Sequence, residues 1–325
     1  MDPNRKGESR TGQLRTEGWY RGSPRRSPAD RDLGNAVITT RDGEDMHPKV
    51  ENRTLCRAAH AIRVAVTMLA LLGAASGWAA EETTELAKKS QNPIADLISV
   101  PLQSNFNFGV GPKNVTQYVL NVQPVIPFKL TSEWNLITRT VLPIINQPSP
   151  ADGIQSAFGL GDLNPSFFLS PAKPDALIWG VGPTFTLPTA TDTSLGSGKW
   201  SLGPTAVALA IQGPWVFGAL ANQQWSFAGD SDRRSVSQML VQPFLNYNFR
   251  DGWYLTSSPI ITANWMADSG NKWTVPLGGG FGKVWRIGKV GLPVNTQLQA
   301  FYNVEKPHDA ADWTLRFQLQ FLLPK

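Results

Sequence analysis

The glycine-rich stretch PLGGGFGKVWR (Pro276–Arg286) has residue types that could bind a phosphate group. A phosphate-binding loop needs the spacing G-x-x-x-x-G-K-[ST], in which the last hydroxyl binds magnesium. Counting back from Gly282 places Leu277 at the first glycine position, and Val284 follows Lys283 where a hydroxyl is required. The spacing therefore argues against a nucleotide site and leaves the glycines to be explained by another geometry.

The remaining candidates for chemistry lie in polar stretches. His308 is the only histidine after residue 80, and no recognisable nucleophile accompanies it. The stretch FGLGDLNPSFF (Phe158–Phe168) lacks the third glycine of a dinucleotide-binding turn, so entry into a strand explains it better. Asp230, Asp232 and Asp268 could bind calcium, but coordination needs about six or more converging oxygens, which favours solvated loop acids. We expect no catalytic residue, no cofactor and no metal site.

The positive charge of the chain is concentrated near its N-terminus. Residues 1–80 contain 13 of the 30 Lys and Arg and 9 of the 25 Asp and Glu, so residues 81–325 contain 17 and 16 and are almost neutral. A nucleic-acid partner is not expected, because phosphate binding needs a clustered basic face. The single cysteine, Cys56, lies in the same early part, which excludes a disulfide framework.

An export signal is predicted within residues 46–80. Two arginines precede an apolar run, Val64–Ala75, and small residues follow it. This layout is typical of a secretory signal, and the run is too short for a membrane helix, which needs about 20 apolar residues. We expect cleavage near Ala79 or Ala80.

Residues 1–45 are polar, rich in arginine and without apolar periodicity, which predicts a disordered segment. Because export signals begin near the start of a chain, we hypothesise that translation starts at Met46 and that residues 1–45 are a mis-annotated upstream segment. A long natural leader is the alternative. A native precursor peptide from upstream of Met46 would contradict the hypothesis.

From Ile98 onward, apolar side chains recur at every second position, which is the period of a β-strand. Residues 81–97, before them, form a short helix-like periplasmic segment. No helical pattern of ordinary length interrupts residues 98–325, which are therefore expected to be all-β. The twelve alternating runs lie at residues 98–108, 116–128, 134–144, 163–169, 177–187, 200–208, 215–227, 239–249, 253–265, 273–285, 292–302 and 313–323.

Three features favour a transmembrane up-and-down antiparallel β-barrel over a soluble sandwich. Each run has one apolar face and one face rich in Gln, Asn, Ser and Thr, which suits strands between lipid and a wet lumen. Tryptophans gather near the ends of the runs, as in interfacial girdles. Long and short connections alternate, so with both termini in the periplasm the long loops lie outside. A sandwich would instead bury all the apolar faces in one core and expose charged faces.

The polar faces supply the candidates for lining the lumen. Arg139 and Arg316 are expected to point inward, because an arginine facing lipid at mid-bilayer costs about 2–4 kcal/mol. Each could select ions or could pair structurally with an acid or a backbone carbonyl. Gly278, Gly280 and Gly282 share this face, where they leave space or let a side chain or the N-terminal segment approach. The predicted lumen-lining residues are Gln103, Asn105, Gln117, Asn121, Gln123, Asn135, Arg139, Gly278, Gly280, Gly282, Arg316, Gln318 and Gln320.

Six stretches carry a family resemblance: ELAKKSQNPIADLISVPLQSNFNFGVGP, LNVQPVIPFKL, WNLITRTVLPI, FGLGDLNPSFFLSP, PLGGGFGKVW and ADWTLRFQLQFLLPK. They span residues 85–325 and resemble a bacterial family labelled "neuromedin U" or "MetA-pathway of phenol degradation". The resemblance implies an outer-membrane β-barrel, a transporter linked to aromatic or other hydrophobic compounds, and no catalytic residues. The chain differs from many such barrels in ending Leu323-Pro324-Lys325 rather than on an aromatic residue, and Phe321 is the candidate assembly signal.

The sequence therefore predicts a channel or transporter in the outer membrane of a Gram-negative bacterium that admits small, hydrophobic or aromatic solutes. Its expected partners are outer-membrane lipid, the small-molecule solute and the barrel-assembly machinery. The alternative is a structural or surface-interaction barrel with a plugged lumen and no transport. A lipid-active barrel enzyme is disfavoured, because no predicted strand carries a histidine. The sequence leaves open whether residues 81–97 plug the lumen or rest at its periplasmic mouth.

Overall fold

The computed structural model describes residues 77–173, 175–288 and 291–323, with residues 77–80 described as backbone. The predicted upstream segment, residues 1–45, lies outside the described residues. Residues 46–76 of the predicted signal region also lie outside them. No helix in the described part of the chain is long and apolar enough to cross a membrane.

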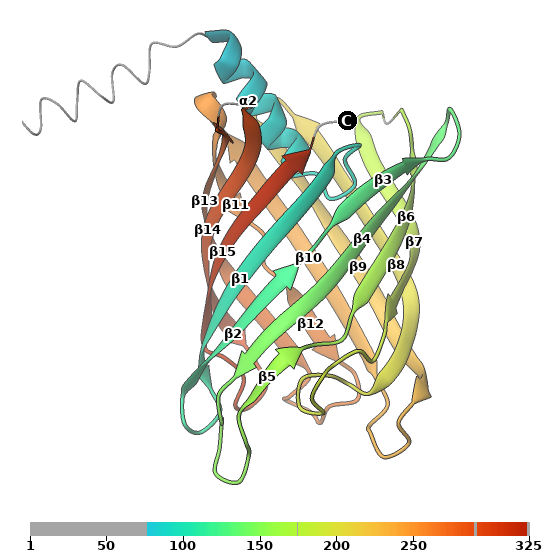
Figure 1. The fold of residues 1–325 in the computed structure, drawn as a ribbon, viewed down its shortest axis with the longest axis vertical. Coiled ribbons are helices and arrows are strands. Elements are labelled where there is room, and N and C mark those ends of the chain that lie inside the picture. The colour runs from blue at the N-terminus through green and yellow to red at the C-terminus, as the bar shows by residue number, and fades with distance from the viewer. Residues whose placement is uncertain (1–76, 174, 289–290, 324–325) are drawn as a thin grey trace, which may run out of the picture. The chain divides into compact units, whose positions relative to one another are not determined.

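The chain from Ile98 onward forms a closed antiparallel β-barrel (Figure 1). The ring closes because the first strand pairs with the last, with Ile98 opposite Leu323 and Phe108 opposite Trp313. Three pairs of segments, β2 with β3, β5 with β6 and β11 with β12, each share one position in the wall, so the fifteen segments form the twelve strands that were predicted. The elements are α2 (Gly77–Ser90), β1 (Ile98–Val110), β2 (Val115–Val122), β3 (Val125–Lys129), β4 (Trp134–Gln147), β5 (Ala157–Leu160), β6 (Asn164–Pro171), β7 (Leu177–Thr186), β8 (Lys199–Gln212), β9 (Trp215–Gly229), β10 (Ser237–Asn248), the 3-10 helix η1 (Arg250–Gly252), β11 (Trp253–Ser257), β12 (Ile261–Asn264), β13 (Trp273–Ile287), β14 (Leu292–Glu305) and β15 (Trp313–Leu323).

The interrupted strands are broken where the sequence places proline or glycine. Pro124 separates β2 from β3 and Pro259 separates β11 from β12, because proline has no N–H to donate to the ladder. Gly161 lies between β5 and β6. The neighbouring strand spans the first break, since β4 pairs with β2 through residues 142–146 and with β3 through residues 135–139. The wall therefore stays continuous across the interruption.

The two faces of the wall are inverted relative to those of a water-soluble protein. In β8, the side chains of Trp200 and Leu202 point outward and are 44% and 40% exposed, whereas Ser201 and Thr205 are buried on the inner face. An apolar outer face around a polar interior is the arrangement that lipid favours. The soluble sandwich is wrong for this chain, because its apolar faces do not meet in a core between two sheets.

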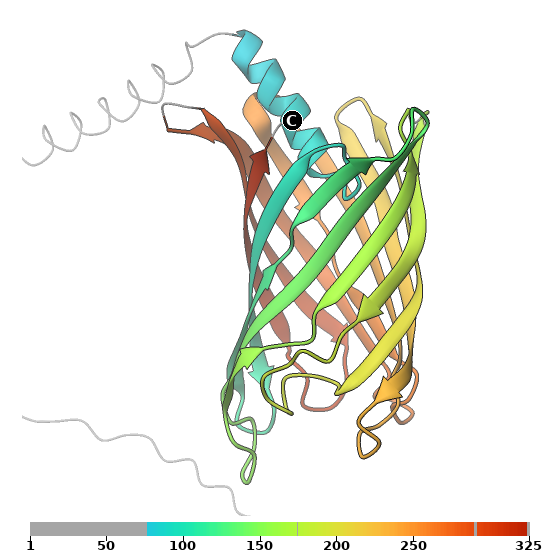
Figure 2. The same ribbon diagram turned by 45° about the vertical axis from the view of Figure 1, so that its right-hand side comes forward.

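The two ends of the barrel differ in their connections (Figure 2). Long loops follow β4, β7, β9, β12 and β14 and, with the turn after β1, lie at one end, which we call the long-loop end. Short turns follow β3, β6, β8, β10 and β13 at the opposite, short-turn end, where α2 and the last residues of β15 also lie. The predicted alternation of long and short connections holds except at the turn after β1, residues 111–114, which is as short as the turn after β3, residues 130–133.

Tryptophans ring both ends of the wall, as the sequence predicted. Those at the short-turn end are Trp134, Trp179, Trp215, Trp253 and Trp285, and those at the long-loop end are Trp200, Trp225, Trp265, Trp273 and Trp313. Neighbouring rings contact one another across strands, for example Trp265 with Trp273 at 5.5 Å between ring centroids. Amphipathic indole rings in two belts are typical of a wall that meets two membrane–water interfaces.

Candidate functional site: the barrel lumen

The N-terminal segment (residues 81–97) enters the barrel at the short-turn end (Figures 1 and 2). The predicted helical piece is α2, which ends at Ser90, three residues before a proline that cannot continue it. The buried side chains of Ala87 and Leu97 pack against Tyr254, Val284 and Leu322 of the wall. The segment therefore does not merely rest at the mouth of the barrel.

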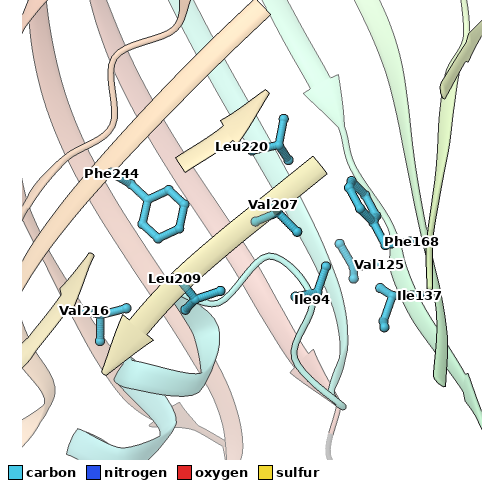
Figure 3. Packing of buried hydrophobic residues seen from close by; sticks show 9 residues of the cluster. All are labelled: Ile94, Val125, Ile137, Phe168, Val207, Leu209, Val216, Leu220 and Phe244. Carbon is cyan, nitrogen blue, oxygen red and sulfur yellow. The ribbon is translucent and has the colours of Figure 1, made fainter. Parts of the chain in front are cut away.

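The tip of the segment reaches a second, deeper apolar cluster. Ile94 is 4% exposed and lies among inward-pointing side chains of the wall (Figure 3). The wall residues of this cluster come from β3, β4, β6, β8, β9 and β10 and are Val125, Ile137, Phe168, Val207, Leu209, Val216, Leu220 and Phe244. The hydrophobic effect therefore holds the segment inside the barrel.

Polar contacts orient the same segment. The side-chain amides of Gln91 and Asn248 bond reciprocally, at 2.9 Å from Gln91 Nε2 to Asn248 Oδ1 and 3.1 Å from Asn248 Nδ2 to Gln91 Oε1. Asn295 Nδ2 donates to Ser90 Oγ at 3.2 Å. The side chains of Gln91, Asn248 and Asn295 are buried, so these hydrogen bonds satisfy polar groups that would otherwise be costly to bury.

Predicted lumen residues on β1, β2 and β15 form a hydrogen-bonded polar wall together with Asn295 of β14, which was not predicted. Gln103 Nε2 donates to Gln318 Oε1 at 3.3 Å, and the amide of Asn295 donates to Gln320 Oε1 at 3.1 Å. Asn121 lies beside Gln103, and its amide donates to Gln103 Oε1 at 3.5 Å. Because neutral amides both donate and accept, a row of them can satisfy itself without fixed charge.

Two predicted lumen residues lie toward the ends of the barrel. Gln117 bonds Asn107 and Gln147 near the long-loop end. Asn135 lies near the start of β4 at the short-turn end and pairs with Lys129 of β3 and Ser170 of β6 in the ladder. The structure therefore does not bring these two into the central group, and a lumen-lining role for all the predicted residues stays a prediction.

An apolar half of the inner surface was missed by the sequence reasoning, which expected amide and hydroxyl groups throughout. The inner face of β8 carries Val207 and Leu209, which are 2% and 1% exposed, and Phe168 on β6 is fully buried. In β8 and β9 apolar residues occupy both faces, so alternation alone does not distinguish inside from outside. The near-continuous apolar runs in β8 and β9 were the sequence signal from which this apolar part of the inner surface could have been predicted.

The two predicted inward arginines differ in their contacts. Arg316 is 5% exposed; its Nε donates to Asn105 Oδ1 at 3.0 Å, and its NH1 donates to the carbonyl of Ser258 at 2.9 Å. Its guanidinium also stacks over the ring of Phe301, 4.9 Å from the centroid. Ser258 opens the break between β11 and β12, so Arg316 satisfies a carbonyl that the ladder leaves free. These contacts match the structural alternative for Arg316.

Arg139 has fewer contacts. Its NH2 donates to Gln123 Oε1 at 2.7 Å, and this is its single hydrogen bond within the described residues. The ladder places Arg139 beside Val125 of β3 and Ser166 of β6. Among the described residues, Arg139 therefore has fewer hydrogen-bond partners than Arg316.

The glycine-rich stretch lies within β13 and forms no loop. A Cβ on Gly282 would overlap the ring and hydroxyl of Tyr254, the side chain that packs beneath α2. A Cβ on Gly280 would overlap the carbonyl oxygen of Leu298, and one on Gly278 that of Ala300. Of the expected reasons for these glycines, close approach by a side chain matches Gly282 alone, whereas Gly278 and Gly280 lie against backbone carbonyls of β14 rather than open space.

Three adjoining cavities occupy the interior. The first, of about 290 Å³, lies below the tip of the N-terminal segment and is lined by Arg139. A second, of about 310 Å³, is lined by Arg316 and shares Gln103 and Asn121 with the first. A third, of about 730 Å³, lies toward the long loops and shares Leu240 with the first. Shared wall residues place these cavities next to one another along the barrel.

The other candidates for chemistry lie in the loops. His308 is exposed, and its backbone N–H donates to Asn271 Oδ1 at 2.8 Å. The carboxylate of Asp162 accepts from the backbone N–H of Ser197 at 2.7 Å and from its hydroxyl at 2.8 Å, so it fixes the long loop after β7. Asp230 accepts from the backbone N–H of Asp232 at 2.9 Å, which is a turn contact. Within the described residues, no group of three or more His, Cys, Asp or Glu side chains is arranged to hold a metal.

Comparison with known proteins supports the fold. No family model matches the chain, and no curated protein matches it. Among solved structures, the chain is similar to the COG4313 outer membrane channel from Pseudomonas putida F1, with a TM-score of 0.53 and 17% identity over 70% of this chain and 94% of that one. It also matches the outer membrane phospholipase A from Escherichia coli (12% identity, 74% and 98% covered) and LpxR from Salmonella typhimurium (8%, 69% and 99%), but TM-scores of 0.38 and 0.35 are too low to support an argument. The chain thus shares its barrel fold with an outer membrane channel.

Proposed function

We propose that this protein is a channel or transporter of the outer membrane of a Gram-negative bacterium and that it admits small hydrophobic or aromatic solutes. The observation that carries the proposal is the row of adjoining cavities inside a closed barrel, one side of which is apolar. A wall of neutral amides with an apolar side suits solutes that are small and weakly polar, because such solutes bind by burial of apolar surface and a few hydrogen bonds.

The location is part of the same proposal. Its support is the apolar outer face, the two tryptophan belts and the predicted signal peptide cleaved near Ala79 or Ala80. Insertion would then depend on outer-membrane lipid and on the barrel-assembly machinery. The chain in this proposal is not an enzyme, because within the described residues no side-chain hydrogen bond joins His308 to a serine or threonine hydroxyl.

One observation favours the alternative of a barrel without transport: the N-terminal segment packs deep inside the lumen, with Ile94 buried in the wall cluster. A barrel permanently occupied in this way would serve a structural or surface-interaction role. The two functions predict different effects of deleting residues 81–97. If the segment gates passage, its deletion should raise the rate of solute passage; if the barrel has a structural role, no passage should follow.

Passage is tested with purified protein reconstituted into liposomes and planar bilayers, after heat-modifiable gel migration and outer-membrane fractionation have established folding and location. The proposal expects uptake of small aromatic solutes by the full chain and faster uptake when residues 81–97 are deleted. A correctly folded barrel that is inert in both forms supports the structural alternative and contradicts transport. A protein found in the soluble periplasmic pool contradicts the location.

A further inference from the structure

One lumen cavity contains a single fixed charge. The cavity of about 290 Å³ below the N-terminal segment has Arg139 as the only charged residue among the described residues that line it. Amides such as Gln123, Gln242 and Gln318 make up much of the remaining surface. A cation without a carboxylate in a partly dehydrated interior is costly to maintain, because burial of a charge is offset best by an opposite charge.

The hydrogen bonds of Arg139 leave most of its guanidinium unused. Arginine has five N–H donors in a planar fork. Within the described part of the chain one of them is bonded, to Gln123 Oε1, and the four ion pairs found there do not include Arg139. By contrast, Arg316 is engaged by Asn105, Ser258 and the ring of Phe301. Arg139 therefore has free donors that face a cavity, and Arg316 has a structural role.

Part of the wall of this cavity is apolar, although Asn222 of β9 and Gln242 and Asn246 of β10 also line it. Leu220 of β9 and Leu240 and Phe244 of β10 line it, and in the strand order these strands lie across the barrel from β4, which carries Arg139. Figure 3 shows Phe244 on the far side of the cluster from Ile137, which precedes Arg139 by two residues on β4. A ligand that spans the cavity would thus meet a guanidinium at one end and apolar side chains at the other.

We propose that this cavity binds a small amphipathic monocarboxylate, with the carboxylate on the free donors of Arg139 and an aromatic or short aliphatic body against Leu220 and Phe244. The inference rests on the proposed channel function and names the class of its solute. Carboxylates match the guanidinium fork, which can donate two parallel hydrogen bonds. The volume is near the lower end of about 300–1,000 Å³ for small-molecule sites, which suits a single-ring acid.

The test uses the full chain in lipid nanodiscs and isothermal titration with three probes of similar size: benzoate, benzyl alcohol and benzylamine. Benzoate is expected to bind more tightly than the alcohol, and the amine is expected to bind weakest. Arg139→Gln should weaken benzoate binding by about tenfold or more, because a hydrogen-bonded charge pair is lost, and should leave the alcohol unaffected. Arg139→Lys keeps the charge without the planar fork, so its affinity for benzoate should lie between those of the wild type and Arg139→Gln.

Lys272→Gln is the matched control. It removes one positive charge from the cavity nearer the long loops, so it changes the net charge of the barrel without touching Arg139. Benzoate affinity should stay within about twofold of the wild type, because Lys272 lines the cavity toward the long loops and not the one that Arg139 lines. Heat-modifiable migration of each variant establishes that it is folded. Equal binding of benzoate and benzyl alcohol, no measurable binding of benzoate, or an equal loss in Lys272→Gln would each overturn the assignment.

Binding and passage are separate measurements. Benzoate that binds at Arg139 in a barrel that passes no solute, even without residues 81–97, contradicts the proposed function and leaves the site. A barrel that passes neutral aromatic solutes but shows no dependence on Arg139 contradicts the site alone.

Discussion

The contact that we expect to hold the N-terminal segment in the lumen is that of Ile94 with the wall. This side chain is 4% exposed and lies between wall residues such as Val125 and Val207 (Figure 3). Replacement of Ile94 by alanine removes most of its apolar surface from the cluster and leaves the backbone of the N-terminal segment unchanged. We expect the segment to leave the lumen more often, because its remaining contacts are fewer and more polar.

The size of the effect follows from burial. Truncation of a buried isoleucine to alanine costs about 2–5 kcal/mol, and the lower end applies where water can enter the space, as it can in a lumen. A loss of about 2 kcal/mol makes the released state roughly thirtyfold more populated. Replacing Gln91 by alanine as well removes its two hydrogen bonds to Asn248, at about 1 kcal/mol each. The double variant should then populate the released state roughly a thousandfold more than the wild type.

Single-channel recording in planar bilayers measures this directly, as the frequency of high-conductance events per channel. Ile94→Ala should raise the frequency of these events roughly thirtyfold, and the double variant should raise it roughly a thousandfold. Ile154→Ala is the matched control, because it removes the same atoms from a loop residue that is 51% exposed. An unchanged event frequency in both lumen variants, in barrels that still migrate as folded, would refute the reasoning that burial of Ile94 keeps the segment in place.

Three further changes test the wall and the loops. Arg316→Gln should lower the free energy of unfolding of the barrel by about 1.5–3 kcal/mol, because the carbonyl of Ser258 loses a charged donor. An unchanged melting curve by circular dichroism would contradict this. Gly282→Ala should destabilise by about 1–3 kcal/mol through overlap with Tyr254, and Tyr254→Leu should recover part of the loss if the overlap is the cause. Asp162→Asn should speed proteolysis within the long loop after β7 and leave the barrel intact, whereas an unchanged cleavage rate would mean that other contacts hold the loop.

Much of the fold could be predicted from local pattern. Side chains of a strand alternate between faces, so the period-two runs located the strands, and the alternating connections identified the two ends. Arg139 and Arg316 could be placed inside the wall on electrostatic cost alone. The strand breaks were harder to predict, because Pro124 and Pro259 interrupt hydrogen bonding without interrupting the alternation of side chains.

The candidate site depended more on contacts between distant segments. The sequence could not separate the apolar half of the lumen from the outer face, because Val207 and Leu209 lie in a run that is apolar on both sides. It also could not say why Gly282 is a glycine, since the answer is Tyr254 on the neighbouring strand. Each of these facts concerns a partner that lies across the barrel or on another strand, and no local pattern encodes it.

By itself the sequence determined that this chain forms a barrel with about twelve strands, an apolar exterior and inward arginines, because those properties follow from the period of a strand and the cost of charge in lipid. The tertiary structure decided that the N-terminal segment reaches into the lumen. It also decided that Arg316 is bound to a backbone carbonyl, whereas Arg139 makes a single hydrogen bond within the described residues. Closure of the wall is the physical reason: it brings β4 opposite β9 and β10, and only then do Arg139 and the apolar side chains of those strands surround one space.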